Sequence, residues 1–159
     1  MLKYDTGKKS DSDYFDILTG FRGQFFAKGE IEGKIGYRSQ NYEDFSRDFD
    51  SVIMSASLVE KFSEKDTLTI DAGRTTTSTI YQQNAYFKST NVSGEYARAL
   101  NDRVTAKVTG AYWFNKYPND ATEGAKTAKR ADDLWRTGVG VSYKFPQYGT
   151  VGLDYTYTE

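Results

Sequence analysis

Hydrophobic and polar residues alternate one by one along most of this chain, and they almost nowhere follow the spacing of a helix. The segment 104–114 shows the alternation most clearly. One side of it carries Val104, Ala106, Val108, Gly110, Tyr112 and Phe114. The other side carries polar residues such as Thr105, Lys107 and Thr109, with Trp113 among them. A period of two over this length predicts a β-strand with one apolar and one polar face.

The same alternation predicts seven further strands, so that the expected fold class is all-β. These strands cover approximately residues 14–26, 31–42, 50–62, 67–75, 86–97, 134–145 and 150–158. Two of the eight strands are less regular than the others. Ile53 and Val59 fall on the polar side of their strand, and Lys88 falls on the apolar side of another.

The connections between the predicted strands alternate in length. Short turns lie at 27–30, 63–66, 99–102 and 146–149, and longer polar segments lie at 6–13, 43–48, 76–85 and 118–132. The first three short turns begin 36 residues apart, which is the repeat of a β-hairpin. We therefore interpret residues 1–159 as a single β-barrel domain or barrel segment made of four β-hairpin repeats.

Strands with one apolar face occur in sandwiches, in soluble barrels and in membrane barrels. Strands of about 9–13 residues match the length that crosses a bilayer at a tilt, whereas sandwich strands are shorter. Short turns at one end and long loops at the other are typical of outer-membrane barrels, and so are aromatic residues at the strand ends. We predict an antiparallel up-and-down (meander) transmembrane β-barrel of eight strands, either closed on itself or part of a larger barrel.

Composition excludes most catalytic chemistry. The chain has no cysteine and no histidine, which excludes disulfides, Cys/His zinc sites and Ser-His catalysis. The formal net charge of −1 gives no reason to expect nucleic acid. Acidic residues at 11–13, 43–50 and 120–123 lack the spacing of a defined calcium loop, and we expect solvated loop charges there. We predict no enzymatic activity, no cofactor and no metal.

Three stretches carry a resemblance to a known family. They are Tyr96-Ala97-Arg98-Ala99-Leu100-Asn101-Asp102-Arg103-Val104-Thr105-Ala106, the segment 130–145, and Gly152-Leu153-Asp154-Tyr155-Thr156-Tyr157-Thr158-Glu159. They resemble the repeated hairpins of outer-membrane β-barrel porins that are associated with exopolysaccharide gene clusters in Gram-negative bacteria. The resemblance implies a location in the bacterial outer membrane and a role in exopolysaccharide export.

The two ends of the chain suggest a segment of something longer. No signal peptide precedes Leu2-Lys3-Tyr4, which looks like the end of a strand. Members of the family are longer and usually end in an aromatic residue, whereas this chain stops at Glu159. We expect a mature or excised segment.

The polar faces of the predicted strands supply the candidate pore-lining residues. These are Arg22, Lys34, Arg38, Asp71, Glu95, Arg103, Lys107, Trp113, Arg136, Lys144 and Asp154. With Asp16 and Glu32 added, the predicted lumen has seven cations and five carboxylates. This excess favours the passage of anionic solutes or an acidic polysaccharide, and the alternative is a cross-strand salt-bridge ladder that only holds a wet interior together.

The apolar faces supply the candidate lipid-facing residues. These are Phe21, Ile35, Met54, Leu58, Ile70, Val108, Val139, Val141 and Leu153. Trp113, Phe87 and Tyr117 fall on the polar side near the long loops, where rings can stack on sugars or cap the barrel end. The expected partners are outer-membrane lipid, a polysaccharide or another anionic solute, and periplasmic export components.

Two other functions remain open. A small eight-stranded barrel that binds an apolar ligand would turn bulky apolar residues inward. A structural outer-membrane scaffold would have a closed lumen and no conductance.

Overall fold

The computed structural model describes residues 12–25, 28–42, 49–78, 86–123 and 126–159. Among them there is no helix that could cross a membrane. The described residues form eight β-strands: β1 Ser12–Phe25, β2 Gly29–Tyr42, β3 Phe49–Lys61, β4 Asp66–Ser78, β5 Tyr86–Ala99, β6 Val104–Glu123, β7 Lys126–Phe145 and β8 Gly149–Thr158.

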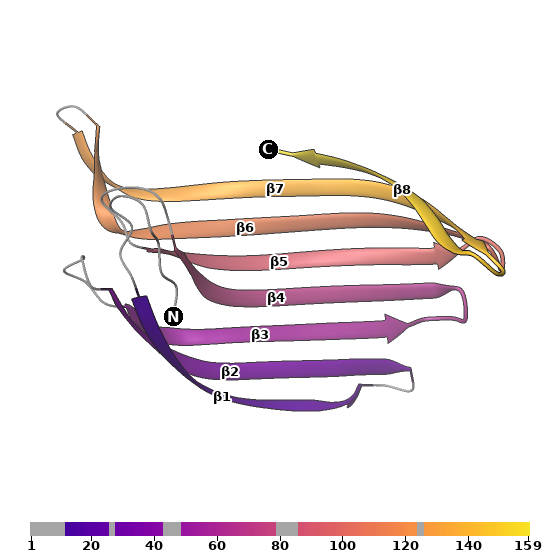
Figure 1. Ribbon diagram of the computed structural model, residues 1–159, viewed down its shortest axis with the longest axis horizontal. Helices are drawn as coiled ribbons and strands as arrows, with labels where there is room; N and C mark the ends of the chain where they lie inside the picture. The colour runs from indigo at the N-terminus through magenta and orange to yellow at the C-terminus, as the bar shows by residue number, and fades with distance from the viewer. Residues whose placement is uncertain (1–11, 26–27, 43–48, 79–85, 124–125) are drawn as a thin grey trace.

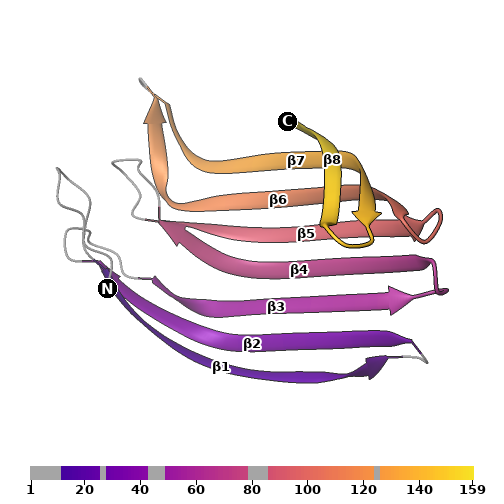
Figure 2. The same ribbon diagram turned by 45° about the vertical axis from the view of Figure 1, so that its right-hand side comes forward.

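All eight strands belong to one antiparallel sheet in which each strand pairs with the next along the chain (Figures 1 and 2). The predicted all-β meander is therefore confirmed. The sheet does not close, because β1 and β8 are its two outer strands and each pairs with only one neighbour. The interpretation of residues 1–159 as one domain or barrel segment stays a prediction.

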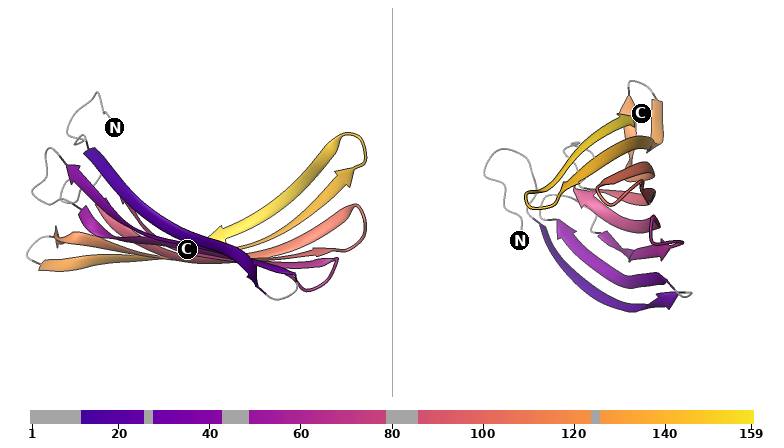
Figure 3. Two further views of the ribbon diagram at one scale, coloured as in Figure 1. Left: turned by 90° about the horizontal axis from the view of Figure 1, so that it is seen from below. Right: turned by 90° about the vertical axis from the view of Figure 1, so that its right-hand side faces the viewer.

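The sheet curves into an open trough rather than lying flat (Figure 3). Short turns join β3 to β4, β5 to β6 and β7 to β8 at one end of the trough, and the strand ends that precede the longer connections lie at the other end (Figure 1). We call these the short-turn end and the long-loop end. Right-handed strand twist and regular pairing give a sheet this curvature, which is the geometry of a barrel wall.

Side chains close two of the short turns. The Ser63 hydroxyl donates to the Asp66 carboxylate at 2.7 Å and accepts from the backbone N–H groups of Lys65 and Asp66. The side-chain amide oxygen Oδ1 of Asn101 accepts from the backbone N–H groups of Arg103 and Val104, each at 2.9 Å. Both are local polar side chains that satisfy backbone groups of the turn. The two turns lie where the sequence predicts them.

The predicted loop at 118–132 is wrong. Most of this segment belongs to β6 and β7, which stay paired as a hairpin as far as Glu123 and Lys126. The register between the two strands has an irregularity between Lys116 and Asp120. Pro118, which lacks a backbone N–H, lies at this irregularity. The residues beyond it are small or charged, so they show no apolar alternation, but the register sets Asp120 opposite Lys129.

The remaining predicted long loops can be compared with the structure only in part. β4 continues through Ser78, so the start of the segment 76–85 is strand. Residues 1–11, 43–48 and 79–85 lie outside the described residues, and with them most of the predicted long loops and the acidic segment at 43–48.

Candidate functional site

The pairing register sorts the described residues into two faces. One continuous cross-strand row runs through all eight strands as Arg22, Glu32, Ser57, Asp71, Ser93, Ala111, Arg136 and Thr158. Because successive side chains of a strand point to opposite faces, this row and every second row beside it define the polar face. The candidate pore-lining residues in strands all lie on this face, which the sequence alternation predicts.

The opposite, apolar face is uncovered. Phe21, Ile35, Met54, Ile70, Val108, Val139, Val141 and Leu153 are all exposed, and Leu58 is half-buried. Leu153 is 75% exposed and Val108 57%. No second layer of the described chain packs against these side chains, so the fold has no dry core between two layers. An apolar face of this extent marks contact with lipid or another protein.

The space around glycines shows that the polar face is the inner side of the curve. A Cβ added at Gly36 on the polar face would meet the Ile17 carbonyl oxygen, and one at Gly138 would lie 2.7 Å from the Thr109 hydroxyl. On the apolar face, a Cβ at Gly23 or Gly110 would meet nothing within 4 Å. Curvature crowds neighbouring strands on the concave side, so the polar residues line the trough.

Aromatic residues bracket the apolar face. At the long-loop side Tyr112 and Trp135 make an edge-on contact at 5.6 Å, and at the short-turn end Tyr143 and Phe145 make one at 4.7 Å. Tyr143 pairs with Val104, eight residues before Tyr112 on the same strand. Eight residues span about 27 Å along a strand, or about 20 Å along the normal at the usual tilt. This height matches the apolar band of a membrane barrel.

A partly buried ion pair joins β1 and β2 on the polar face near the long-loop end. Arg38 donates to both carboxylate oxygens of Asp16 through Nε at 2.8 Å and Nη2 at 2.7 Å. Its Nη1 donates to the Thr76 hydroxyl at 3.4 Å, and its guanidinium lies 4.9 Å from the Tyr14 ring centre. The two-point geometry fixes the register of the pair as well as neutralising it.

Other charges on the polar face also form ion pairs, either within one strand or across strands. Glu32 forms ion pairs with Lys34 and, at 3.6 Å, with Arg22. At the other side of the sheet, Lys107 pairs with Asp154 at 2.9 Å across β7. Part of the predicted excess of cations is therefore used in a cross-strand ladder.

Two carboxylates and two cations in the strands lack such a partner. Within the described residues, no ion pair within 4.0 Å involves Asp71, Glu95, Arg136 or Lys144. Arg103 lies in the turn before β6, and its guanidinium donates to the Tyr143 hydroxyl at 3.4 Å. Tyr143 belongs to the apolar face. The Arg103 side chain therefore extends past the end of the sheet toward that face, unlike the other pore-lining candidates.

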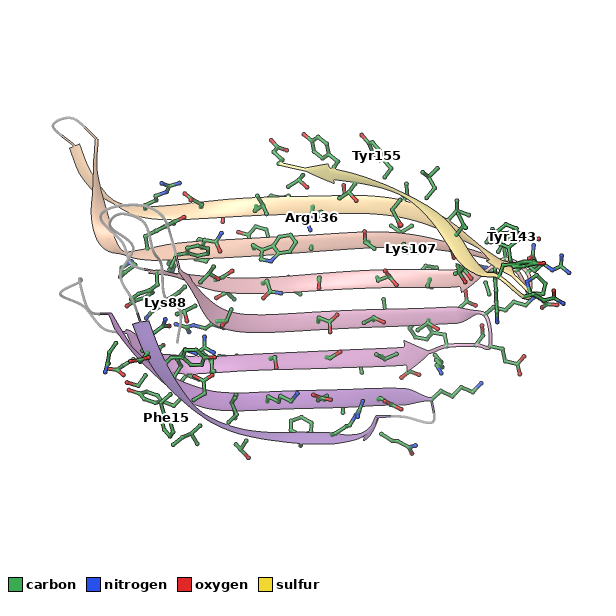
Figure 4. All side chains as sticks on the ribbon, viewed as in Figure 1. Phe15, Lys88, Lys107, Arg136, Tyr143 and Tyr155 are labelled. Carbon is green, nitrogen blue, oxygen red and sulfur yellow. The ribbon has the colours of Figure 1, made fainter. Side chains whose placement is uncertain are left out.

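Arg136 and Trp113 meet in the middle of the trough. The Arg136 guanidinium carbon lies 5.0 Å from the Trp113 ring centre, which is cation–π geometry. Both line a cavity of about 390 Å³ together with Asp71, Glu95 and the hydroxyl residues Thr69, Ser93 and Thr109. Figure 4 shows Arg136 and Lys107 along the middle of the sheet, away from Tyr143 at the short-turn end.

The structure adds a further cation–aromatic contact that the sequence analysis missed, because it assigned Arg130 to a loop. Arg130 lies 4.8 Å from the Tyr117 ring centre, and Tyr117 contacts Phe87 at 5.4 Å. Arg130 also holds Asp132 in an ion pair of 2.8 Å. These hydrogen bonds lower the pKa of the Asp132 carboxyl, which lies beyond the Tyr112–Trp135 aromatic pair. The sequence contains one indication of this strand extension: Arg130, Asp132, Leu134 and Arg136 occupy alternate positions and share the polar face of β7.

The comparison with known families agrees with this geometry. The family described as Putative beta-barrel porin 2 matches residues 3–159. No curated protein and no solved structure matches the chain. The family supports a porin-like barrel and suggests a role other than catalysis. An open curved sheet with a polar trough and an uncovered apolar outside fits a β-barrel fold, and the chain belongs to the Putative beta-barrel porin 2 family.

Proposed function

We propose that this chain forms part of the wall of a passage through the bacterial outer membrane, and that the polar face of the sheet lines its lumen. One observation carries the proposal: the apolar face is exposed over its whole width, while most charged side chains of the strands lie in the trough, where several of them form ion pairs. In water this arrangement would expose apolar surface at great cost, and in a bilayer it removes that surface from water.

The solute that we propose is anionic, with an acidic exopolysaccharide as the polymer that the family resemblance suggests. Support comes from Arg136, whose guanidinium is held over Trp113 without a carboxylate partner within 4.0 Å. A stacked guanidinium keeps its edge N–H donors free for a carboxylate or phosphate. Wall charges of this kind set the selectivity of a channel.

The test is conductance of the refolded protein in planar bilayers. We expect a polar passage to conduct ions and, in a potassium chloride gradient, to give a reversal potential that favours chloride. Arg136→Gln should reduce this preference, because it removes an unpaired positive charge from the lumen. Lys65→Gln makes the same charge change in the β3–β4 turn and serves as the matched control.

Two results would count against the proposal. A folded barrel migrates faster on a gel before boiling than after it. Protein that shows this shift but gives no conductance would favour the scaffold with a closed lumen. A cation preference that Arg136→Gln leaves unchanged would contradict an anionic solute. The third function, a soluble barrel that binds an apolar ligand, has no support in the trough, whose lining is polar.

A further inference from the structure

Arg74 is one of the cations in the strands that lie outside the trough. Arg74 follows Leu68, Ile70 and Ala72 at every second position of β4, so it lies on the apolar face. In the register it faces Met54 on one side and Thr90 on the other. It is half-buried, and among the described residues no carboxylate lies within 4.0 Å of its guanidinium. An unpaired cation on a lipid-facing surface is costly and is usually functional.

Arg74 stands at the rim of an apolar groove on this same face. The groove has a volume of about 630 Å³, within the range of ligand sites, and its lining is mostly apolar. Its floor is a row of small residues on adjacent strands, namely Gly33, Ala56 and Ala72. Phe21, Ile35 and Met54 flank this row. The Phe21 ring lies so close to Gly33 that a Cβ there would be 2.6 Å from the ring.

The position of Arg74 along the strands matches the level of lipid headgroups. Its cross-strand row continues through Thr90 to Phe114, one row beyond the aromatic pair Tyr112 and Trp135. The exposed Lys116 follows Phe114 on that face, with its ammonium 4.8 Å from the Phe114 ring centre. Three cations, Arg74, Lys88 and Lys116, thus lie at the long-loop edge of the apolar band, where basic residues bind lipid phosphates.

We propose that this groove binds one phosphorylated lipid of the leaflet at the long-loop end. Its acyl chain lies over Ala56 and Ala72, beside the Phe21 ring that covers Gly33, and its phosphate accepts hydrogen bonds from Arg74, with Lys116 adding positive charge on the same face. The phosphate supplies the negative partner that the described chain does not give Arg74. A planar guanidinium suits this role because it can bind two phosphate oxygens at once.

The test is native mass spectrometry of the folded protein in detergent micelles with added dioleoyl phosphatidic acid. We expect retention of one phosphatidic acid and about tenfold less retention for Arg74→Gln, with Arg74→Lys between them. Ala72→Phe should also abolish retention, because it fills the floor of the groove. Lys144→Gln removes one positive charge on the polar face, outside the groove, and should retain the lipid as the wild type does.

Two further ligands distinguish the sources of binding. Dioleoylglycerol has the same chains without the phosphate and should not be retained, and inorganic phosphate should not compete. Equal retention of dioleoylglycerol, or equal loss in Lys144→Gln and Arg74→Gln, would overturn the proposal. Its outcome is independent of conductance: a protein that retains the lipid but conducts no ions would contradict the proposed passage and support the lipid site.

Discussion

The two faces of this sheet have the same backbone and differ in what surrounds their side chains. On the polar face, concave curvature brings neighbours together, and Arg38 and Asp16 become mostly buried although no second layer covers them. On the apolar face the same curvature spreads the side chains, and Val108 and Leu153 stay exposed. The difference shows that this fold is stabilised by lateral pairing and by its environment rather than by a buried apolar core.

The strongest way to break this comparison is to put a charge on the wrong face. Val108→Arg should destabilise the folded state in lipid vesicles by about 2–4 kcal/mol, because the apolar face must meet hydrocarbon. Thr109→Arg, one residue further on the polar face, should cost much less, since Glu95 lies opposite Thr109 in the register. Urea unfolding followed by tryptophan fluorescence measures both. Equal destabilisation would show that both faces meet the same medium.

A smaller effect tests the crowding of the concave side. Gly36→Ala should destabilise the fold by about 1–3 kcal/mol, because the new methyl group meets the Ile17 carbonyl oxygen and the Leu18 side chain. Gly110→Ala adds the same methyl group on the open convex side and should change stability by no more than about 0.5 kcal/mol, in either direction. Thermal unfolding in one detergent compares the two variants. A larger loss of stability in Gly110→Ala than in Gly36→Ala would contradict the assignment of the polar face to the crowded, concave side.

The smallest effect sharpens the comparison within the trough. A double-mutant cycle with Asp16→Asn and Arg38→Gln should give a coupling of about 1–2 kcal/mol that persists in 1 M salt, because this pair is shielded from water and hydrogen-bonded at two points. The same cycle with Lys107→Gln and Asp154→Asn should give a coupling that salt removes, since both side chains are largely exposed. Identical salt dependence of the two couplings would contradict the difference in shielding.

Local patterning predicted the strands well because alternation is a local property. The sequence places Val108 and Lys107 on opposite faces, and the register does the same. It also places a turn at Ser63 and at Asn101, since the polar groups that close these turns are adjacent in the chain. The extension of β6 and β7 was missed because its residues have no apolar face to reveal them, and backbone pairing needs none.

The contacts of the site could not be predicted in the same way. Nothing in the neighbourhood of Arg38 indicates that it holds Asp16 while reaching Thr76, or that Arg136 lies over Trp113. These contacts depend on the register and the twist of several strands together. Arg74 stands on the apolar face by simple alternation, yet its meaning came only with the groove beside it.

The sequence by itself determined most of the residues in strands, which of them share a face, and that one face is apolar and the other charged, because side chains alternate along any extended chain. The tertiary structure decided which face is concave, which charges meet and which stay alone, and that the eight strands curve without closing. Those properties arise from hydrogen bonding and twist between strands distant in the sequence, which no single strand contains.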